Sequence, residues 1–230
     1  MTSGPRQIDL EAPEQGPRHA ARATRTAGRQ MRSKLLDAAS RRFKELGLAG
    51  ASIADIATAA DAFPSQITYY FRTKEALFVE AACRDVLYLA QSAEVAGAKT
   101  HTPQDYTRAL AETVTAGDSV AFFAEALTLT RRRPDLAPLV ERTIARLHAE
   151  GTRAYEEQMQ RHGWRSLRDP ETTSRRFWAI AIGVMVEGYA MGRATDDLSA
   201  EVLRLIGEQA DTKRLRVVGN KEDENGECGS

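Results

Sequence analysis

A short segment around residue 67 carries polar side chains that could hydrogen-bond nucleic acid. Ile67 and Phe71 lie one helical turn apart, so a helix here would turn them toward a core and its other side chains outward. Amide and hydroxyl groups on that outer face could contact base edges or phosphate oxygens. The outward residues are Ser65, Gln66, Thr68, Tyr69 and part of Tyr70. The alternative is an ordinary solvent-exposed helix with aromatic packing.

Lys74 follows this segment at the expected start of the next helix, where Thr73 can act as the N-cap. An ammonium group there joins the partial positive charge of the helix N-terminus, which favours a bound phosphate. We therefore expect Lys74 to hold a DNA phosphate. An ordinary solvated lysine is the alternative.

Two other short-range patterns would position this polar face. Apolar residues spaced by three or four positions predict a helix over residues 30–46, which Gly47 would end. Ser52 and Asp55 can form a capping box that starts a second helix, and Pro64 suits the first position of a third. Three helices in this order, with a tight break between the last two, are typical of a helix-turn-helix that enters the DNA major groove.

The chain has no formal net charge, yet its cations gather near the N-terminus. Residues 18–49 contain nine basic and two acidic side chains, a net charge of +7 that suits attraction to phosphates. Residues 1–29 contain prolines, glycines and few large apolar side chains, so we expect a flexible basic arm there. The arm either makes no contact or reaches a minor groove. Its candidate contacts are Arg22, Arg25, Arg29 and Arg32.

The remainder of the chain is expected to be helical, because it shows no sustained alternation of apolar and polar residues. The predicted fold class is therefore all-α. Capping signals and apolar stripes predict helices from Thr73, Thr102 and Asp118, then over 135–161 with an irregularity near Pro138, over 170–193 and over 199–210. The predicted domains are a helix-turn-helix domain over 30–78, a second helical domain over 79–212 and a disordered tail over 213–230.

These motifs as a set resemble the N-terminal domain of tetracycline-repressor-like (TetR family) regulators. The resemblance covers about residues 30–80 and includes the basic first helix, Ser52-Ile-Ala-Asp-Ile-Ala, a helix ending in Tyr-Phe, and Thr73-Lys-Glu-Ala-Leu. It implies that Ser52 and Ala54 approach the DNA, that the outward residues of 65–70 touch bases or phosphates, and that Lys74 touches a phosphate. The helical remainder is similar to that family's ligand-binding and dimerising domain.

Three positions depart from the family's pattern. Asp61 replaces the usual turn glycine, Phe63 the usual serine cap, and Thr68 a frequent tyrosine. Asp tolerates a left-handed turn better than most residues, and Thr68 keeps a hydroxyl group. The departures therefore concern individual contacts and leave the helix-turn-helix interpretation intact.

Residues 177–191 contain a single charged side chain, Glu187, so this helix is expected to be covered on more than one side. Small residues at i,i+4 spacing would let a partner helix approach closely. The predicted interface residues are Ala179, Gly183, Val184, Gly188 and Gly192. A central core helix in a monomer is the alternative. The resemblance favours a homodimer, since such regulators usually pair their last two long helices with those of a second copy.

Aromatic and apolar residues of the second domain could line an effector pocket or simply form its core. Glu125 and Glu187 interrupt apolar stretches and could fix a polar ligand group or reach solvent. The candidate pocket residues are Tyr106, Phe122, Phe123, Glu125, Tyr155, Trp178 and Met185.

Other classes of function lack support in the sequence. No apolar run is long enough for a membrane span, and the N-terminus has no apolar secretory signal, so a cytoplasmic protein is expected. Cys83 and Cys228 lie far apart and the four histidines form no i,i+4 pair, so no disulfide, metal site or cofactor is expected. No nucleophile with a nearby base and no Gly-rich phosphate loop points to an enzyme.

The sequence therefore predicts a homodimeric TetR-like regulator that binds a palindromic operator in double-stranded DNA. We expect a repressor that an unidentified small molecule releases from the operator. The alternative is a regulator of the same fold with no small-molecule effector, which answers to a partner protein or acts constitutively.

Overall fold

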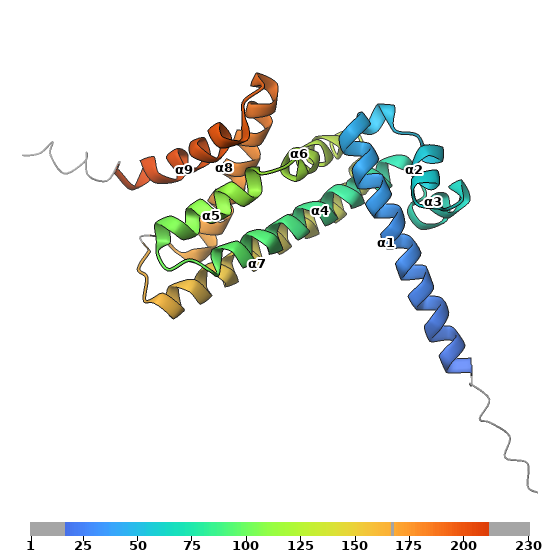
Figure 1. The fold of residues 1–230 in the computed structure, drawn as a ribbon, viewed down its shortest axis with the longest axis horizontal. Coiled ribbons are helices and arrows are strands. Elements are labelled where there is room, and N and C mark those ends of the chain that lie inside the picture. Colours follow the sequence, from blue (N-terminus) through green and yellow to red (C-terminus); the bar gives the residue numbers. More distant parts are fainter. Residues whose placement is uncertain (1–16, 167, 212–230) are drawn as a thin grey trace, which may run out of the picture.

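A computed structural model describes the backbone of residues 17–166 and 168–211 and the side chains of 26–166 and 168–207. Every regular element within these ranges is helical, which confirms the predicted all-α class (Figure 1). Residues 1–16 of the predicted arm and the predicted tail over 213–230 lie outside the described residues. The elements are α1 (Pro17–Gly50), α2 (Ile53–Ala59), α3 (Pro64–Phe71), α4 (Lys74–Gly97), α5 (Pro103–Thr115), α6 (Ser119–Leu129), a short 3₁₀ turn η1 (Pro134–Leu136), α7 (Ala137–His162), α8 (Pro170–Met191) and α9 (Thr195–Asp211).

The first helix is longer than predicted. It begins at Pro17 rather than at residue 30, so residues 17–29 of the expected flexible arm are helical. This stretch is rich in alanine and arginine, both strong helix formers, and proline suits a first helical position. Near its other end the helix breaks at Gly47, whose φ of 68° fits the predicted end. The N-terminal part of α1 extends away from the other helices (Figure 1).

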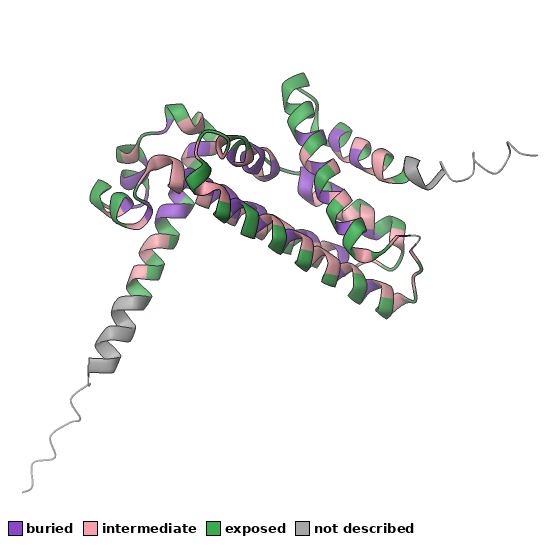
Figure 2. Cartoon of the chain, turned by 180° about the vertical axis from the view of Figure 1, so that it is seen from behind, coloured by how far each residue is buried: buried purple, intermediate pink, exposed green. Residues whose placement is uncertain are grey.

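Helix α4 is shared by the two parts of the molecule. It packs against α1 and α3 on one side of the domain boundary and against α5, α6 and α7 on the other. Figure 1 shows it running beside α7 from the N-terminal helices into the second domain. The predicted apolar stripe is present: Phe78, Ala82, Val86 and Ala93 are buried, and Leu89 is half-buried. Figure 2 shows that the other long helices also have one buried and one exposed side.

Three phenylalanine rings join α1, α4 and α6. Phe43 meets Phe78 edge to face with ring centroids 5.0 Å apart, and Phe78 meets Phe122 at 4.9 Å. All three side chains are buried. An edge-to-face pair of aromatic rings stabilises the fold by more than the burial of its apolar surface alone would give. Phe122 is therefore a core residue at the domain junction.

Two helix starts in the second domain differ from the predicted ones. The irregularity expected near Pro138 takes the form of the 3₁₀ turn η1, which precedes α7. Pro138 therefore lies in the first turn of α7, where proline is tolerated. Helix α9 begins at Thr195 rather than at residue 199. Asp196 and Asp197 lie in its first turn, where carboxylates stabilise a helix N-terminus.

Asp118 stands at the predicted N-cap position of α6, but its side chain makes no capping hydrogen bond. Its carboxylate instead accepts a hydrogen bond from the hydroxyl of Tyr189 on α8. Burial, followed by this carboxylate, raises the pKa of Tyr189 to about 12. The phenol therefore stays protonated at neutral pH, and the contact links α6 to α8.

Candidate functional site

The helix-turn-helix consists of α2 and α3. Ser52 caps α2 as predicted: its hydroxyl accepts a hydrogen bond from the Asp55 N–H at 3.0 Å and donates one to the Asp55 carboxylate at 2.6 Å. Asp61 reverses the chain with a φ of 51°, in the left-handed region expected for this turn residue. The third helix then buries Ile67 and Phe71, as their spacing predicts.

The outer face of α3 is open to solvent. Tyr69 is 81% exposed, and its ring lies edge-on to that of Tyr70 with centroids 5.0 Å apart. Of the predicted DNA contacts on α2 and α3, the exposed ones are Ser52, Ala54, Ser65, Thr68 and Tyr69, and the half-buried ones are Gln66 and Tyr70. The two helices therefore present polar and aromatic groups that a DNA groove could meet.

Two predicted contact residues also have structural partners. The side-chain oxygen of Gln66 accepts a hydrogen bond from the Phe63 N–H at 3.0 Å, at the start of α3. The ammonium of Lys74 donates to the backbone oxygen of Ala51 at 3.0 Å and ties α4 to the segment before α2. Since an ammonium has three donors and an amide NH₂ has two, both side chains keep donors for DNA.

Two further exposed residues lie beside α3, outside the predicted set of contacts. Phe63 is 76% exposed, and a phenylalanine in a major groove can pack against a thymine methyl group. Arg72 ends α3 with a φ of 68° and is exposed, with no carboxylate of the described residues within ion-pair distance. Phe63 lies four residues before Ile67, on the same spacing as the buried Ile67 and Phe71, so the spacing in the sequence gives no signal of its exposure. The backbone conformation of Arg72 has no sequence signal either.

Part of the positive charge on α1 is neutralised inside the protein. Arg32 pairs with Glu80 of α4 and lies over the ring of Phe71, 5.2 Å from its centroid. Arg42 pairs with Glu45 at 3.0 Å. Arg32, predicted as a contact of the arm, is thus engaged within the protomer.

Other cations of α1 remain available for phosphates. Arg29, Lys34 and Arg41 are exposed, and none has an ion pair with a described residue. The side chains of Arg22 and Arg25 lie outside the described residues. Because Arg32, Arg42 and Lys44 already have carboxylate partners, the described part of this segment has fewer cations free for phosphates than its composition implies.

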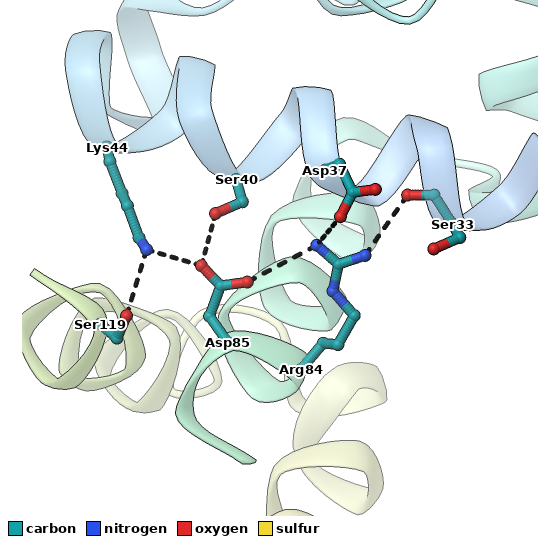
Figure 3. A network of polar contacts seen from close by, with 7 residues as sticks. All are labelled: Ser33, Asp37, Ser40, Lys44, Arg84, Asp85 and Ser119. Carbon is teal, nitrogen blue, oxygen red and sulfur yellow. Dashed lines mark hydrogen bonds and ion pairs between the residues drawn. The ribbon is translucent and has the colours of Figure 1, made fainter. Parts of the chain in front are cut away.

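Asp85 of α4 is the centre of a polar network that fixes α1 to the second domain (Figure 3). Its carboxylate pairs with Lys44 at 2.6 Å and accepts a hydrogen bond from the Ser40 hydroxyl. Lys44 also donates to Ser119 of α6 at 3.2 Å. The Asp85 side chain is only 11% exposed, so water and salt screen these contacts weakly.

The adjacent Arg84 extends the network along α1 (Figure 3). Its guanidinium pairs with Asp37 at 2.9 Å and donates to the backbone oxygen of Ser33 at 3.3 Å. The same guanidinium lies 3.6 Å from a carboxylate oxygen of Asp85. Arg84 and Asp85, which are neighbours on α4, thus form polar contacts with α1 at several successive positions.

Asp85→Asn is expected to destabilise the protein by about 2–4 kcal/mol, because Lys44 and Arg84 would lose their carboxylate in a partly buried site. Urea unfolding measures the change. Glu157→Gln is the matched control: Glu157 pairs with Arg153 at 2.7 Å on an exposed surface, and its loss should cost less than about 1 kcal/mol. Equal losses in the two variants would contradict the importance of burial at Asp85.

One side of α8 is exposed and carries mainly small and apolar residues, with the exposed Glu187 beside them. Val186 is 51% exposed, and the exposed residues Ala179, Gly183 and Ala190 lie on the same side at spacings of four, three and four. A Cβ atom added to Gly183 would meet no atom within 4 Å. This apolar stripe (179, 183, 186 and 190) has no cover from the described residues. Gly192, predicted with the interface, is also exposed and ends α8 with a φ of 63°.

Two predicted interface residues face the interior of the protomer instead. Val184 is 5% exposed, and a Cβ atom on Gly188 would lie 2.1 Å from a methyl carbon of Leu198 in α9. Gly188 therefore allows α9 to pack closely on α8 within one chain. Small residues at i,i+4 spacing look alike in the sequence whether their partner helix belongs to the same chain or to a second copy.

A cavity of about 460 Å³ lies among α4, α5, α7 and α8. Three predicted pocket residues line it: Tyr106, Tyr155 and Trp178. Burial, followed by the negative charge of Glu94, raises the pKa of Tyr106, so its hydroxyl remains a donor at neutral pH. The other predicted pocket residues do not line the cavity, since Phe122, Phe123 and Met185 are packed in the core and Glu125 is exposed.

Among the described residues, no group of three or more His, Cys, Asp or Glu side chains is placed to hold a metal ion. No helix in the described part of the chain combines the length and apolar character needed to cross a bilayer. Cys83 is buried with a free thiol, and burial raises its pKa. Cys228 lies outside the described residues.

Two family models match the chain. The model described as bacterial regulatory proteins, tetR family, matches residues 35–81, which include the helix-turn-helix and the start of α4. The model described as bacterial transcriptional repressor C-terminal matches residues 103–207, which include the apolar stripe and much of the cavity wall. A search of the curated proteins found no match.

Solved structures of similar fold include three of bacterial origin. A protein from Rhodococcus sp. RHA1, assigned as a transcriptional regulator, is 34% identical with a TM-score of 0.69, over 78% of this chain and 94% of that one. An assigned TetR-family regulator from Mesorhizobium loti MAFF303099 is 17% identical with a TM-score of 0.63, over 81% and 97%. The fatty acid degradation regulator FadR from Bacillus halodurans is 15% identical with a TM-score of 0.59, over 84% and 96%. The last two share the fold alone.

Proposed function

The chain belongs to the TetR family of bacterial transcriptional regulators, and from this premise we propose that it is a homodimeric repressor released from a palindromic operator by a small molecule. Regulators of this family are DNA-binding transcription factors without enzymatic activity. We place its action in the bacterial cytoplasm, where the operator is found.

The observation that carries this proposal is the outer face of α3. This helix buries Ile67 and Phe71 and leaves Tyr69 among the most exposed aromatic residues of the described chain. Apart from its edge-on contact with Tyr70, this large aromatic side chain is open to solvent, which supports a contact with DNA. Tyr69 can donate its hydroxyl to a phosphate, while Ser65 and Gln66 are suited to base edges.

Dimerisation through the apolar stripe of α8 would pair two such recognition helices. Exposed Val186 and the open space at Gly183 support a partner helix on this side. A two-fold dimer makes the same contacts on both half-sites, which are read about 34–36 Å apart on one face of the duplex. The operator would therefore be a palindrome.

Release requires a ligand that prefers a different arrangement of the helices around the cavity. Ala90, Ala93 and Glu94 of α4 line the cavity, while Lys74 at the other end of the same helix holds the segment before α2. Displacement of α4 would therefore move the recognition helices relative to each other. A shift from almost complete occupancy to almost complete release needs a ligand preference of about 10⁴-fold, or about 5.5 kcal/mol.

Selection of bound sequences from a random DNA library at a stated, moderate salt concentration tests the DNA-binding part. We expect a palindrome whose half-sites have centres about one helical turn apart. A failure to enrich any sequence would contradict the proposal of a specific operator. An enriched site without two-fold symmetry would contradict the proposed dimeric mode of recognition.

A further inference from the structure

The chemical character of the cavity points to one class of ligand. Its wall includes the rings of Tyr106, Tyr155, Phe177 and Trp178. A volume of about 460 Å³ lies within the range of sites for small organic molecules. This aromatic part of the wall fits an apolar ligand body.

The cavity wall carries more positive than negative side chains. Arg165, Arg168 and Arg176 line the cavity, against two carboxylates, Glu94 and Glu150. Both carboxylates already have cationic partners outside the wall, Glu94 with Arg153 at 3.0 Å and Glu150 with Arg146 at 2.7 Å. The carboxylates therefore do little to neutralise Arg165 and Arg176, which give the cavity wall an excess of positive charge.

Arg176 on α8 is the centre of this excess. Its Nη2 atom is buried and has no hydrogen-bond partner, and no carboxylate of the described residues lies within ion-pair distance. Burial, followed by the nearby positive charge of Arg168, lowers the pKa of the Arg176 guanidinium. An arginine nevertheless stays charged in proteins. Burial of this charged donor therefore costs free energy, which a bound anion would offset.

We propose that the cavity binds an organic anion whose acidic group contacts Arg176 and whose apolar body lies against the aromatic wall. A carboxylate, sulfonate or phosphate offers the same acceptor oxygens to the unpaired guanidinium donor. This inference rests on the proposed function only in taking the cavity as the effector site. It adds that the effector is an acid.

A pair of fluorescent probes that differ in one charged group tests the proposal. The probes are 8-anilinonaphthalene-1-sulfonate and N-phenyl-1-naphthylamine, which share a ring skeleton while only the first carries an acidic group. We expect the wild-type protein to bind the sulfonate more tightly. Arg176→Gln should weaken sulfonate binding by about tenfold or more, as expected for loss of a charged hydrogen bond, and leave the neutral probe almost unaffected.

Arg142→Gln is the matched control, because Arg142 is exposed on α7 and outside the cavity wall, and its loss changes the net charge equally. The melting temperature of Arg176→Gln gives a second readout. Since Nη2 of Arg176 has no hydrogen-bond partner among the described residues, removal of this side chain should not lower the melting temperature, whereas loss of a structural role would. Arg165→Gln, at an exposed position of the wall, is expected to weaken sulfonate binding without affecting folding.

Equal affinity of the wild-type protein for the two probes, or no binding of either, would overturn the inference. The same would follow if Arg142→Gln weakened sulfonate binding as much as Arg176→Gln. Operator binding is measured separately on the same wild-type preparation. If the protein bound the operator but did not discriminate between the probes, the acidic ligand would be rejected and the DNA-binding proposal would stand. If the protein discriminated between the probes but did not bind an operator, only the DNA-binding proposal would be rejected.

Discussion

Loss of Tyr69 and Gln66 is expected to abolish measurable operator binding. Each base or phosphate contact of this kind contributes about 1–3 kcal/mol, and a two-fold dimer makes each contact twice. Removal of even one contact per protomer therefore costs about 2–6 kcal/mol, or about 30-fold to 10⁴-fold in affinity. Fluorescence anisotropy with the selected operator measures the loss.

The two residues need separate variants, because the Gln66 side chain also accepts a hydrogen bond from the Phe63 N–H at the start of α3. Tyr69→Ala removes an exposed side chain with little structural role. Gln66→Ala also removes the capping hydrogen bond of α3, which destabilises the fold by about 1 kcal/mol. Tyr88→Ala is the control, since Tyr88 is an exposed tyrosine (57%) on α4. Full operator affinity in the Tyr69→Ala variant would show that the recognition surface lies elsewhere.

The second large effect is expected from a charge at the apolar stripe of α8. Gly183→Glu should leave the protomer folded, since a Cβ atom there meets no atom of the same chain and glutamate favours a helix more than glycine. In a dimer with these stripes at its interface, the substitution would bury charges from both copies in an apolar interface. We expect dissociation to monomers at micromolar concentration, measured by sedimentation velocity.

Operator affinity should fall together with the dimer, because two linked half-sites gain about 10²–10⁴-fold from effective concentration. Ala145→Glu places the same charge on an exposed part of α7 and should leave both properties unchanged. If Gly183→Glu remained a dimer, the interface would have to be assigned to another surface.

Features determined by local chemistry could be predicted from the sequence. The capping pair Ser52 and Asp55, the turn at Asp61 and the buried spacing of Ile67 and Phe71 each depend on neighbouring residues. The start of α1 was missed because the alanine and arginine content of 18–29 outweighs its lack of large apolar residues.

Features that depend on distant parts of the chain could not be predicted. Phe123 and Tyr106 are both buried aromatic residues, yet only Tyr106 borders the cavity. That difference follows from how α4, α5, α7 and α8 pack, which no short spacing records. In the same way, Gly183 and Gly188 are equally small, and only the position of α9 decides that Gly188 packs inside the protomer.

In the proposed release mechanism, the shared helix α4 would act as a lever. Lys74 and Glu94 are separated by about 30 Å along its axis, given a rise of about 1.5 Å per residue. A tilt of about 5° pivoted at the cavity end would move the Lys74 end by about 2–3 Å. Hydrogen bonds to base edges tolerate only a few tenths of an ångström. An effector that acts as proposed would therefore not need to open the cavity visibly: a rotation of a few degrees would be amplified along the helix into a loss of register with the DNA.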